Sequence, residues 1–558
     1  MRALSHFRCL GRGALFGWML FAFAFALPAQ AQLGPPPVPP QNPMTAEKVL
    51  LGKALFWEEQ LSLTGTVACG TCHRNQAGGS DPRTALAGPA SVHPGPDEQF
   101  GTRDDIHGSA GVVAHDQGGN LRPAPYFALQ PQVGGRLAPS VYDAAFAPRL
   151  FWDGRAEGAF VDPDTGQTLI PSGGALEIQS LQPLVNTAEM GHAGNLMEHA
   201  AERIVGVIPL ALATDLPPEL ATFIGQRGYP ALFAETFGTP EVTEARIAFA
   251  LASYQRELSK TVVPWDLESQ GTPTLTAQEL EGRLQFQRLR CQLCHAGARH
   301  ADNSFRYIGV RPVDEDLGRF NQTGNANHRG AFRVPSLRNV ALRGPFMHNG
   351  GLATLDEVLS FYKRGGDFDA PNKDGLIGAL FLNDTERADL LAYLTGALTD
   401  PRILAEQPPY DRPTLYSESD RVPELLGAGS GGGLGVPRIS ALEPPHVGNQ
   451  NFTIALSEVA VGAQATLVLS YSDPGVQATV PVAEFASYSA VAVPMVGFSN
   501  GYLSAQVDLS AVPAGSGQTL YGRYYVVDPS APNQLAVSEA IRFSLFGSLD
   551  RFLADGFE

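Results

Sequence analysis

The sequence predicts a mainly α-helical region followed by a C-terminal antiparallel β-sandwich-like domain. Helical periodicity recurs between residues 44 and 400, for example in the amphipathic segment Thr385–Leu398. Two Cys-x-x-Cys-His motifs each follow a segment expected to be helical, so this region divides into two similar domains in tandem. Between residues 436 and 545, short β-prone runs alternate with turn residues, which is typical of a sandwich.

Length and composition limit the classes to which the chain can belong. With 558 residues, 44% of them apolar and 17% charged, the chain can form several domains with buried cores. This composition excludes a disordered chain and a collagen. The net charge of −17 disfavours nucleic acid and anionic membranes as partners. We expect no membrane span in the mature chain, because no second apolar run approaches about 18 residues.

The N-terminus resembles a secretory signal peptide. Three arginines precede the apolar run at residues 14–27, and the small-x-small pattern Ala29-Gln30-Ala31 follows it. Cleavage after Ala31 would deliver the protein to the periplasm or the exterior. Cys9 would leave with the signal, so four of the five cysteines remain in the mature chain.

These four cysteines all belong to the two Cys-x-x-Cys-His motifs. The motif residues are Cys69, Cys72 and His73 in CGTCH, and Cys291, Cys294 and His295 in CQLCH. The pattern is typical of covalently bound haem c, in which two thiols bond the haem vinyl groups and the histidine binds iron. The alternatives are a redox dithiol, a four-cysteine zinc site or two disulfides. A dithiol does not require the trailing histidine, and zinc would require two distant motifs to converge. We therefore expect two covalently bound haem c groups.

The expected organisation follows from these motifs and from shifts in composition. The expected segments are a signal peptide (1–31), a Pro-rich lead (32–43), a first haem domain (44–240), a second haem domain (241–400), a linker (401–435), a β-sandwich-like domain (436–545) and a tail (546–558). The expected strands are Asn451–Leu456, Ala465–Tyr471, Ala490–Val496, Tyr502–Leu509, Leu520–Val527 and Ile541–Leu545. The β domain is interpreted as an interaction or stabilising module, because nothing in it looks catalytic.

The helical region resembles the bacterial dihaem cytochrome c peroxidases and the MauG proteins over roughly residues 44–400. The segments that carry the resemblance occur in the family's order and are LGKALFWEEQLS, CGTCH, APSVYDAAFAPRLFWDGRAE, LEIQSLQPLVNTAEMG, YQREL, CQLCH, FRVPSLRNVALRGPFMHNG and TLDEVLSFYKRGG. The resemblance implies two cytochrome c-like haem domains with different roles. The first haem, on His73, would be the site of peroxide chemistry.

The resemblance also implies roles for three residues near the first haem. Glu189 in NTAEM and Gln179 in LEIQ match the family's distal carboxylate and amide, which move a proton and position peroxide. Trp152 in FWDGR matches the tryptophan that relays electrons between the haems. Asp153 and Arg155 are expected to form a local salt-bridged turn that holds this tryptophan.

The second haem, on His295, needs a further axial ligand, and two residues are candidates. Met347 in PFMHNG offers a thioether, whereas Tyr362 in TLDEVLSFY occupies the position of the family's ligating residue. MauG-like members carry tyrosine there, so Tyr362 is the preferred ligand. A phenolate favours oxidised iron, so this haem would share oxidising equivalents rather than accept electrons from a small cytochrome.

Calcium binding between the haems is a further family feature, and here it is doubtful. The family's asparagine ligand is replaced by Leu137, although the carbonyls of Arg343 and Pro345 remain. The acidic loop at residues 95–105 is interpreted as a solvated loop rather than a calcium site. The family's loop histidine, which blocks the first haem, cannot be assigned in this sequence.

Two functions from different classes follow. The first is an enzyme that uses hydrogen peroxide, with either a small electron-donor protein or an oxidised protein substrate as its partner. The second is a non-enzymatic dihaem electron-transfer cytochrome. The distal pair Gln179 and Glu189 favours the enzyme, and Tyr362 favours MauG-like oxidation of a partner. The family also implies a possible homodimer.

Overall fold

The computed structural model describes residues 33–85, 91–194, 197–447, 449, 451–509 and 517–547. The predicted signal peptide, with Cys9, and the end of the predicted tail lie outside these residues. Among the described residues, no helix has the length and apolar character needed to cross a membrane.

The longer helices lie in the first three quarters of the chain, and the longer strands follow them. The helices are α1 (Ala46–Phe56), α2 (Cys69–Cys72), α3 (Ala175–Val185), α4 (Met197–Val205), α5 (Pro218–Ile224), α6 (Tyr229–Phe237), α7 (Glu244–Leu258), α8 (Pro264–Ser269), α9 (Ala277–Arg288), α10 (Phe320–Thr323), α11 (Leu355–Arg364), α12 (Asp384–Ala392) and α13 (Pro401–Leu404). The short strands among them are β1 (Val92–His93), β2 (Ile106–His107), β3 (Ala110–Val113), β4 (Pro131–Val133), β5 (Arg149–Leu150), β6 (Ala156–Glu157), β7 (Phe160–Val161), β8 (Thr168–Ile170), β9 (Phe305–Arg306) and β10 (Phe332–Arg333). The C-terminal strands are β11 (Glu424–Leu426), β12 (Arg438–Ala441), β13 (Phe452–Val459), β14 (Gln464–Ser470), β15 (Ala486–Val491), β16 (Val493–Pro494), β17 (Gly501–Val507), β18 (Thr519–Val527), β19 (Leu535–Val537) and β20 (Ala540–Ser544).

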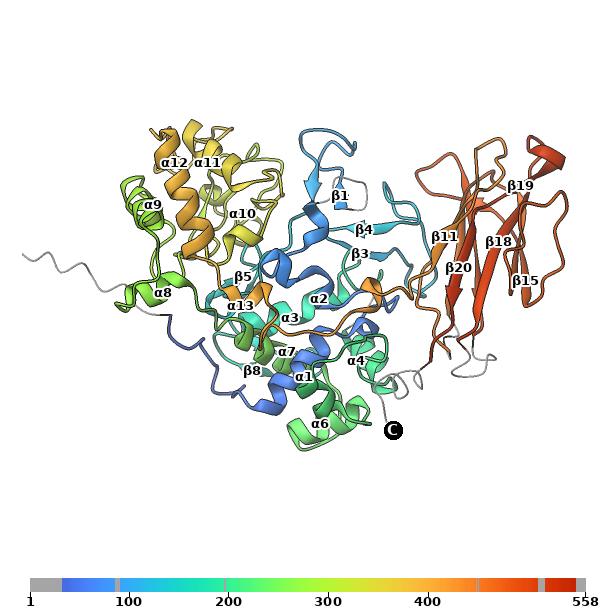
Figure 1. Ribbon diagram of the computed structural model, residues 1–558, viewed down its shortest axis with the longest axis horizontal. Helices are drawn as coiled ribbons and strands as arrows, with labels where there is room; N and C mark the ends of the chain where they lie inside the picture. The colour runs from blue at the N-terminus through green and yellow to red at the C-terminus, as the bar shows by residue number, and fades with distance from the viewer. Residues whose placement is uncertain are drawn as a thin grey trace, which may run out of the picture.

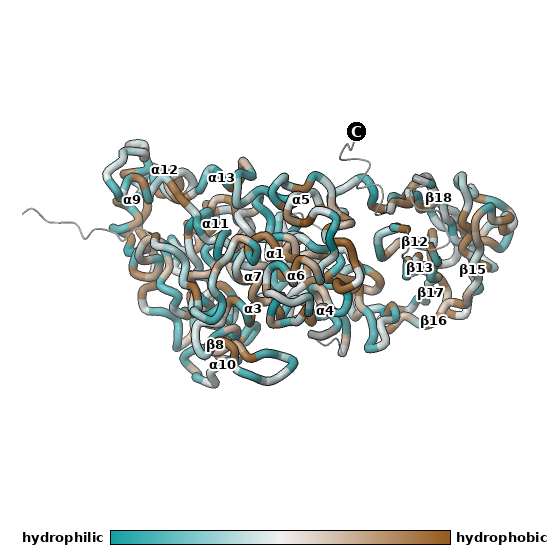
Figure 2. Tube along the Cα trace, turned by 90° about the horizontal axis from the view of Figure 1, so that it is seen from below, coloured by the Kyte–Doolittle hydropathy of each residue, from teal (hydrophilic) through white to brown (hydrophobic). Residues whose placement is uncertain are grey.

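Three parts follow one another along the longest axis of the molecule. Helices α9, α11 and α12 lie at one end, helices α1, α3, α4, α6 and α7 lie in the middle, and strands β11, β18 and β20 lie at the other end (Figure 1). The same order is visible from below (Figure 2).

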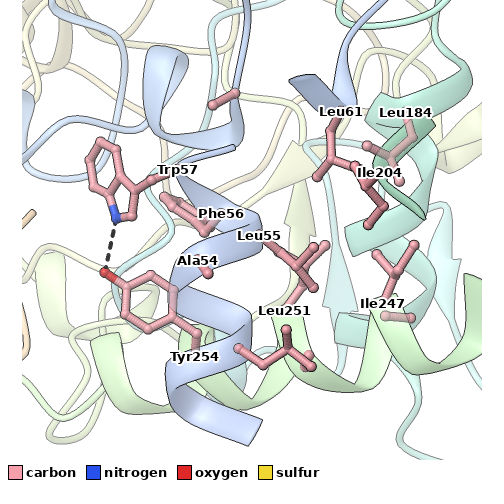
Figure 3. Close-up of a cluster of buried hydrophobic side chains, with 14 of the residues drawn as sticks. Ala54, Leu55, Phe56, Trp57, Leu61, Leu184, Ile204, Ile247, Leu251 and Tyr254 are labelled. Carbon is pink, nitrogen blue, oxygen red and sulfur yellow. Dashed lines mark hydrogen bonds between the residues drawn. The ribbon is translucent and has the colours of Figure 1, made fainter. Parts of the chain in front are cut away.

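The middle part is built around the helix pair α1 and α7. The Thr45 side chain caps α1 by accepting a hydrogen bond from the backbone N–H of Lys48 at 3.2 Å. The two helices touch through their backbones at Gly52, where an added Cβ would lie 2.0 Å from the carbonyl oxygen of Ala250. Apolar side chains of α1, α3, α4 and α7 fill the surrounding core (Figure 3).

Helix α7 therefore belongs to the core of the first haem motif, which is a correction to the predicted layout. The boundary expected after residue 240 assigns this helix to the second domain. In the structure Ile247, Leu251 and Tyr254 are fully or almost fully buried against residues of α1 and its neighbours. The predicted boundary follows the order of the segments along the chain. The packing of α7 is determined instead by its apolar face, which contacts α1 and its neighbours.

The Pro-rich lead is fixed to this same core rather than extended into solvent. Asn42 is buried, and its side-chain amide donates to Glu177 Oε1 at 3.0 Å. Glu177 also forms a buried ion pair with Arg256 at 2.8 Å, and Arg256 Nε donates to the carbonyl of Pro37 at 3.1 Å. The lead thus contributes polar partners to two buried charged groups, which would otherwise be costly to desolvate.

The part at the α9 end has its own smaller core. As the spacing of Thr276 and Glu279 predicts, the two side chains form a capping box at the start of α9. Helix α9 packs closely on α12, since a Cβ at Gly282 would lie 1.9 Å from the carbonyl oxygen of Asp389. Trp265 and Tyr393 are buried in this core.

The C-terminal part consists of two antiparallel sheets that share one apolar core. One sheet has the order β11-β20-β18-β14-β15, with β19 paired to β18, and the other has the order β12-β13-β17-β16. Buried side chains from both sheets, such as Leu456 and Tyr524, form a single cluster. Five of the six expected strands match β13, β14, β17, β18 and β20, while the run at residues 490–496 contains the end of β15 and all of β16.

The segment expected to be a flexible linker is ordered in the structure. Ile403, Tyr410 and Leu415 join the core of the middle part. Strand β11 then pairs with β20 at the edge of the larger sheet, and the backbone of Ser430 pairs with Val537. Residues 401–435 therefore connect the two regions by packing against both of them.

Candidate functional site

The first Cys-x-x-Cys-His motif forms the short helix α2, and its histidine follows the helix directly. The Nδ1 atom of His73 lies 2.9 Å from the carbonyl oxygen of Gly79. This bond holds the neutral ring with Nδ1 protonated, so the lone pair of Nε2 is available to a metal ion. Burial raises the pKa of both thiols, Cys69 and Cys72, to about 12. A redox dithiol needs a lowered thiol pKa, so the environment disfavours that alternative.

A Trp–Tyr pair packs behind this motif. The indole of Trp57 lies so close to Gly70 that an added Cβ would be 2.2 Å from the ring. Its Nε1 donates a hydrogen bond to the Tyr254 hydroxyl at 3.3 Å (Figure 3). Phe56 lies between the pair and His73, with its ring centroid 6.3 Å from that of the histidine. Trp57 thus packs against the backbone of the motif and limits where it can move.

Glu189 lies beside the first motif, on the turn that follows α3. The Asn186 side-chain amide donates to Glu189 Oε1 at 2.7 Å, and the N–H of Val112 donates to the backbone carbonyl of Glu189 at 3.1 Å. Burial raises the pKa of the Glu189 carboxyl, while Arg155 partly opposes that shift. The carboxylate in turn raises the pKa of both thiols of the motif, so the acid and the cysteines are close together.

Gln179 lies on α3 and is half-buried. One helical turn later, Gln182 Oε1 accepts a hydrogen bond from Arg155 Nε at 3.2 Å. Arg155 also pairs with Asp153 at 3.3 Å, so the expected salt-bridged turn is present. Residues three apart share one helix face, which places Gln179 on the side of α3 that carries the contact to Arg155.

Trp152 bonds to two other segments through its indole and its backbone. Its Nε1 donates to the carbonyl of Leu137 at 2.8 Å, and its backbone carbonyl accepts from the N–H of Arg333 at 2.9 Å. The indole meets His348 edge-on at 6.5 Å between centroids, and His348 stacks on Phe332 at 3.6 Å. The same segment continues into the turn at residues 153–155, where the charge of Arg155 acts on Glu189.

The second motif opens into a cavity of about 610 Å³. Cys291, Cys294 and His295 line this cavity, and so does Trp152. The Nδ1 atom of His295 lies 3.1 Å from the carbonyl oxygen of His300, so its Nε2 is again the nitrogen available to a metal ion. Burial lowers the pKa of His295 to about 4, which favours the neutral ring that a metal ligand requires.

Both candidate axial ligands of the second haem line this cavity. Tyr362 extends from α11, and Met347 lies in the loop before that helix. The pKa of the Tyr362 hydroxyl is raised by burial and by its proximity to Cys291 and Cys294. Tyr362 therefore lies close to the second motif, as its position in the sequence predicts.

Three arginines with buried Nε atoms make the cavity suited to an anionic group such as haem. Arg299, Arg333 and Arg343 line it, and the Nε atom of each has no hydrogen-bond partner among the described residues. Burial lowers the pKa of both Arg333 and Arg343 to about 10, and the charges of Arg299 and Arg343 lower the pKa of Arg333 further. Haem combines a large apolar ring with two propionates, and these arginines are suited to bind the propionates.

The described residues contain no group of three or more His, Cys, Asp or Glu side chains that could hold a metal ion. At the expected calcium position, Leu137 uses its carbonyl to accept from Trp152 and its N–H to bond the carbonyl of His348.

Comparison with known proteins places the chain in a family. The family model for di-haem cytochrome c peroxidase matches residues 46–274. The methylamine utilization protein MauG of Methylorubrum extorquens is 30% identical over 373 residues, which cover 66% of this chain and 83% of that protein. The chain belongs to the dihaem cytochrome c peroxidase and MauG family. It is therefore a haem-dependent peroxidase or oxidoreductase.

A second relative by sequence agrees with this family. The cytochrome c551 peroxidase of Nitrosomonas europaea is 28% identical over 345 residues, which cover 61% of this chain and 79% of that protein. A crystal structure of a MauG-like protein associated with microbial copper homeostasis is 27% identical, covers 70% of this chain and 98% of that chain, and has a TM-score of 0.48.

Sequence reasoning missed several members of this dihaem site. Asn186 and Arg155 act directly on Glu189, although Arg155 was assigned to a structural turn alone. Asn186 lies three residues before the acid, a spacing that could have indicated the contact. The three cavity arginines are separated by up to 44 residues, so no local pattern in the sequence marks them as a group.

Proposed function

We propose that this protein is an exported dihaem c-type oxidoreductase that uses hydrogen peroxide at its first haem to oxidise a partner. Haem would be attached covalently at Cys69 and Cys72, with His73 as an axial ligand, and again at the second motif. The two motif regions would form cytochrome c-like domains in tandem, and the C-terminal sheets would form a sandwich beside them. The periplasm is the expected compartment. The observation that carries the proposal is the buried carboxyl of Glu189 beside the first motif.

Haem iron supplies the redox chemistry of peroxide cleavage, and the protein supplies the proton transfer. Glu189 accepts a proton from peroxide at the inner oxygen and returns it to the outer oxygen, which leaves as water. Asn186 holds one carboxylate oxygen at 2.7 Å, so the proton is carried at the other oxygen. Arg155 opposes the effect of burial on the pKa of Glu189 and so favours the ionised carboxylate. Gln179 positions the peroxide.

Trp152 and Tyr362 determine what happens to the oxidising equivalents. Trp152 lines the second cavity and passes electrons from there toward the first site. Tyr362 would bind the iron of the second haem together with His295, since both residues line the same cavity. Its phenolate would be stabilised by iron against the burial that raises its pKa. An anionic ligand stabilises ferric and higher-valent iron over ferrous iron, so this centre would share oxidising equivalents with the first haem rather than be reduced by a small donor cytochrome.

The choice of electron source is tested by peroxide consumption. With reduced cytochrome c as the sole donor, we expect slow turnover, because the Tyr-ligated centre resists reduction. Rapid turnover would replace this proposal with that of a conventional peroxidase. The Tyr362→Met variant provides the comparison, because a thioether ligand should speed electron entry from the cytochrome. Equal rates in both proteins would contradict the role of Tyr362.

A further inference from the structure

Strand β13 is buried on both of its faces, which is unusual for a sheet that covers only one core. Alternate residues of a strand point to opposite faces. Ile454 and Leu456 face the core between the two C-terminal sheets. Ala455 points to the outer face of its sheet, and yet it is 0% exposed. The neighbouring strand β17 instead shows the ordinary alternation of buried and exposed residues.

The outer face at Ala455 is covered by the hairpin of β3 and β4 from the first haem region. Val113 and Leu129 of this region form one buried cluster with Leu442, Ala455 and Met495. Val113 is 6% exposed, Leu129 3% and Met495 2%. Strands β3 and β4 lie between α2 and the C-terminal sheets (Figure 1), and β12 and β13 lie on the side of those sheets nearer the helices (Figure 2). The C-terminal sheets thus pack on the β3–β4 hairpin, which follows the first motif in the chain.

The other face of this hairpin holds the turn that carries Glu189. The N–H of Val112 donates to the backbone carbonyl of Glu189 at 3.1 Å. At Gly111 an added Cβ would lie 2.2 Å from the carbonyl oxygen of Ala188, so the two backbones are in contact. From β4, Gln132 Nε2 donates to the carbonyl of Thr187 at 2.7 Å.

Two adjacent residues of β3 therefore face two different cores. The Val112 side chain belongs to the core of the first haem region, whereas the Val113 side chain belongs to the cluster with Met495. A single strand separates the C-terminal sheets from the turn of the distal acid. A shift of the hairpin on the side of Val113 would also move the N–H of Val112, which is hydrogen-bonded to the backbone of Glu189.

We propose that the C-terminal domain positions Glu189 through the β3–β4 hairpin. This inference rests on the proposed role of Glu189 in proton transfer. Met495 and Ala455 act as positioning residues, because they contact the hairpin and not the reacting groups. Proton transfer depends steeply on geometry, and a misplacement of about 1 Å can cost on the order of 100-fold in rate.

The effect of the position of Glu189 can be tested separately from the effect of the charged groups around it. The carboxyl interacts with Arg155 and with the thiols of Cys69 and Cys72. Replacement of Met495 by alanine alters none of these charges. A change in the behaviour of Glu189 in that variant must therefore come from its position.

The test uses the full-length, haem-loaded protein and compares Met495→Ala with Val496→Ala. Val496 is adjacent in sequence but 58% exposed, so it serves as the matched control. Hydrogen–deuterium exchange is followed in peptides that cover residues 110–113 and 186–190. We expect both peptides of Met495→Ala to exchange about 10-fold faster than those of the native protein, because the N–H of Val112 is protected by its hydrogen bond to the carbonyl of Glu189. Val496→Ala should exchange at the native rate. Unchanged exchange at residues 186–190 in Met495→Ala would overturn the inference.

Rates of the peroxide reaction separate this inference from the proposed function. Met495→Ala should lower the rate constant of the native protein about 10-fold or more, but it should cause no further loss in a Glu189→Gln background. Full additivity of the two losses would overturn the inference. If Glu189→Gln alone leaves the rate unchanged, the proposed function fails, while the exchange experiment still reports on the contact.

A second variant covers the case in which Met495→Ala does not fold. Gly111→Ala acts from within the hairpin, where the new Cβ must displace the turn that carries Glu189. Gly135→Ala is its control, because an added Cβ there meets nothing within 4 Å. We expect faster exchange at residues 186–190 for Gly111→Ala alone. Equal exchange in the two glycine variants would contradict the coupling.

Discussion

Replacement of Glu189 by glutamine removes the proton-carrying group with little change in shape. The Oε1 atom of glutamine can still accept the hydrogen bond from Asn186, which is 2.7 Å long in the native protein. The bond from Val112 is made to the backbone carbonyl and is therefore kept. The variant also removes a carboxyl whose pKa burial raises, so we expect no loss of folding stability.

Glu189→Gln is therefore expected to slow proton transfer without lowering the stability of the fold. A positioned general acid–base contributes about 10²–10⁴-fold, which corresponds to roughly 3–5 kcal/mol of activation free energy at 1.36 kcal/mol per tenfold change. The assay is stopped-flow measurement of the reaction with hydrogen peroxide as a function of pH. Glu189 must be unprotonated to accept the proton, so the native rate falls as pH drops through a pKa raised above 4.5. In Glu189→Gln this acidic limb should disappear.

The matched control is Glu219→Gln, which changes an exposed glutamate on α5. It should keep both the rate and the acidic limb. A Glu189→Gln variant that reacts at the native rate, or that keeps the acidic limb, would refute the assignment of Glu189 as the proton-transfer group.

Three further changes give distinct outcomes. Tyr362→Phe should abolish the low-spin electron paramagnetic resonance signal of the second haem, whereas Met347→Leu should leave it unchanged; the reverse result would assign Met347 as ligand. Burial raises the pKa of Glu59 from 4.5 to about 7, so its stabilising contribution is complete below pH 4.5 and is lost as pH rises through 7. Glu59→Gln should remove this loss of about 3 kcal/mol, and thermal unfolding at pH 5 and pH 8 checks it; an unchanged pH dependence would contradict the assignment. Gly70→Ala places a Cβ 2.2 Å from the Trp57 ring and should lower haem incorporation at the first site, measured by mass spectrometry; native incorporation would contradict a rigid packing there.

Local patterns in the sequence predicted those elements that local interactions determine. The capping box at Thr276 and Glu279 fixes the start of α9 wherever that helix packs. In the same way, the spacing of each Cys-x-x-Cys-His motif places two thiols and a histidine together before any tertiary contact forms. These features depend on neighbours within one or two turns of the chain.

Features that depend on long-range packing could not be predicted in this way. Helix α7 packs on α1, about 200 residues earlier, so its place in the first core has no local signal. Strand β11 has three residues and exists because β20 pairs with it across more than 100 residues. The arginines of the second cavity are likewise grouped by the fold alone.

The candidate site was predicted only in part, because some of its contacts also depend on long-range packing. The resemblance to the family located Glu189, Trp152 and Tyr362, and the structure places each of them beside a motif. The resemblance gave no indication that Arg155 acts on Glu189, nor that the β3–β4 hairpin carries the contact to the C-terminal domain. Both contacts join segments that lie far apart in the sequence, so no local pattern indicates them.

The central claim is that two unlike haems share the oxidising power of peroxide, and electron paramagnetic resonance of the fully oxidised protein tests it most directly. We predict one high-spin signal from the site of His73 and one low-spin signal from the site of His295 and Tyr362. Addition of one equivalent of hydrogen peroxide should diminish both signals together. Two low-spin signals that do not respond to peroxide would contradict the account and indicate an electron-transfer cytochrome.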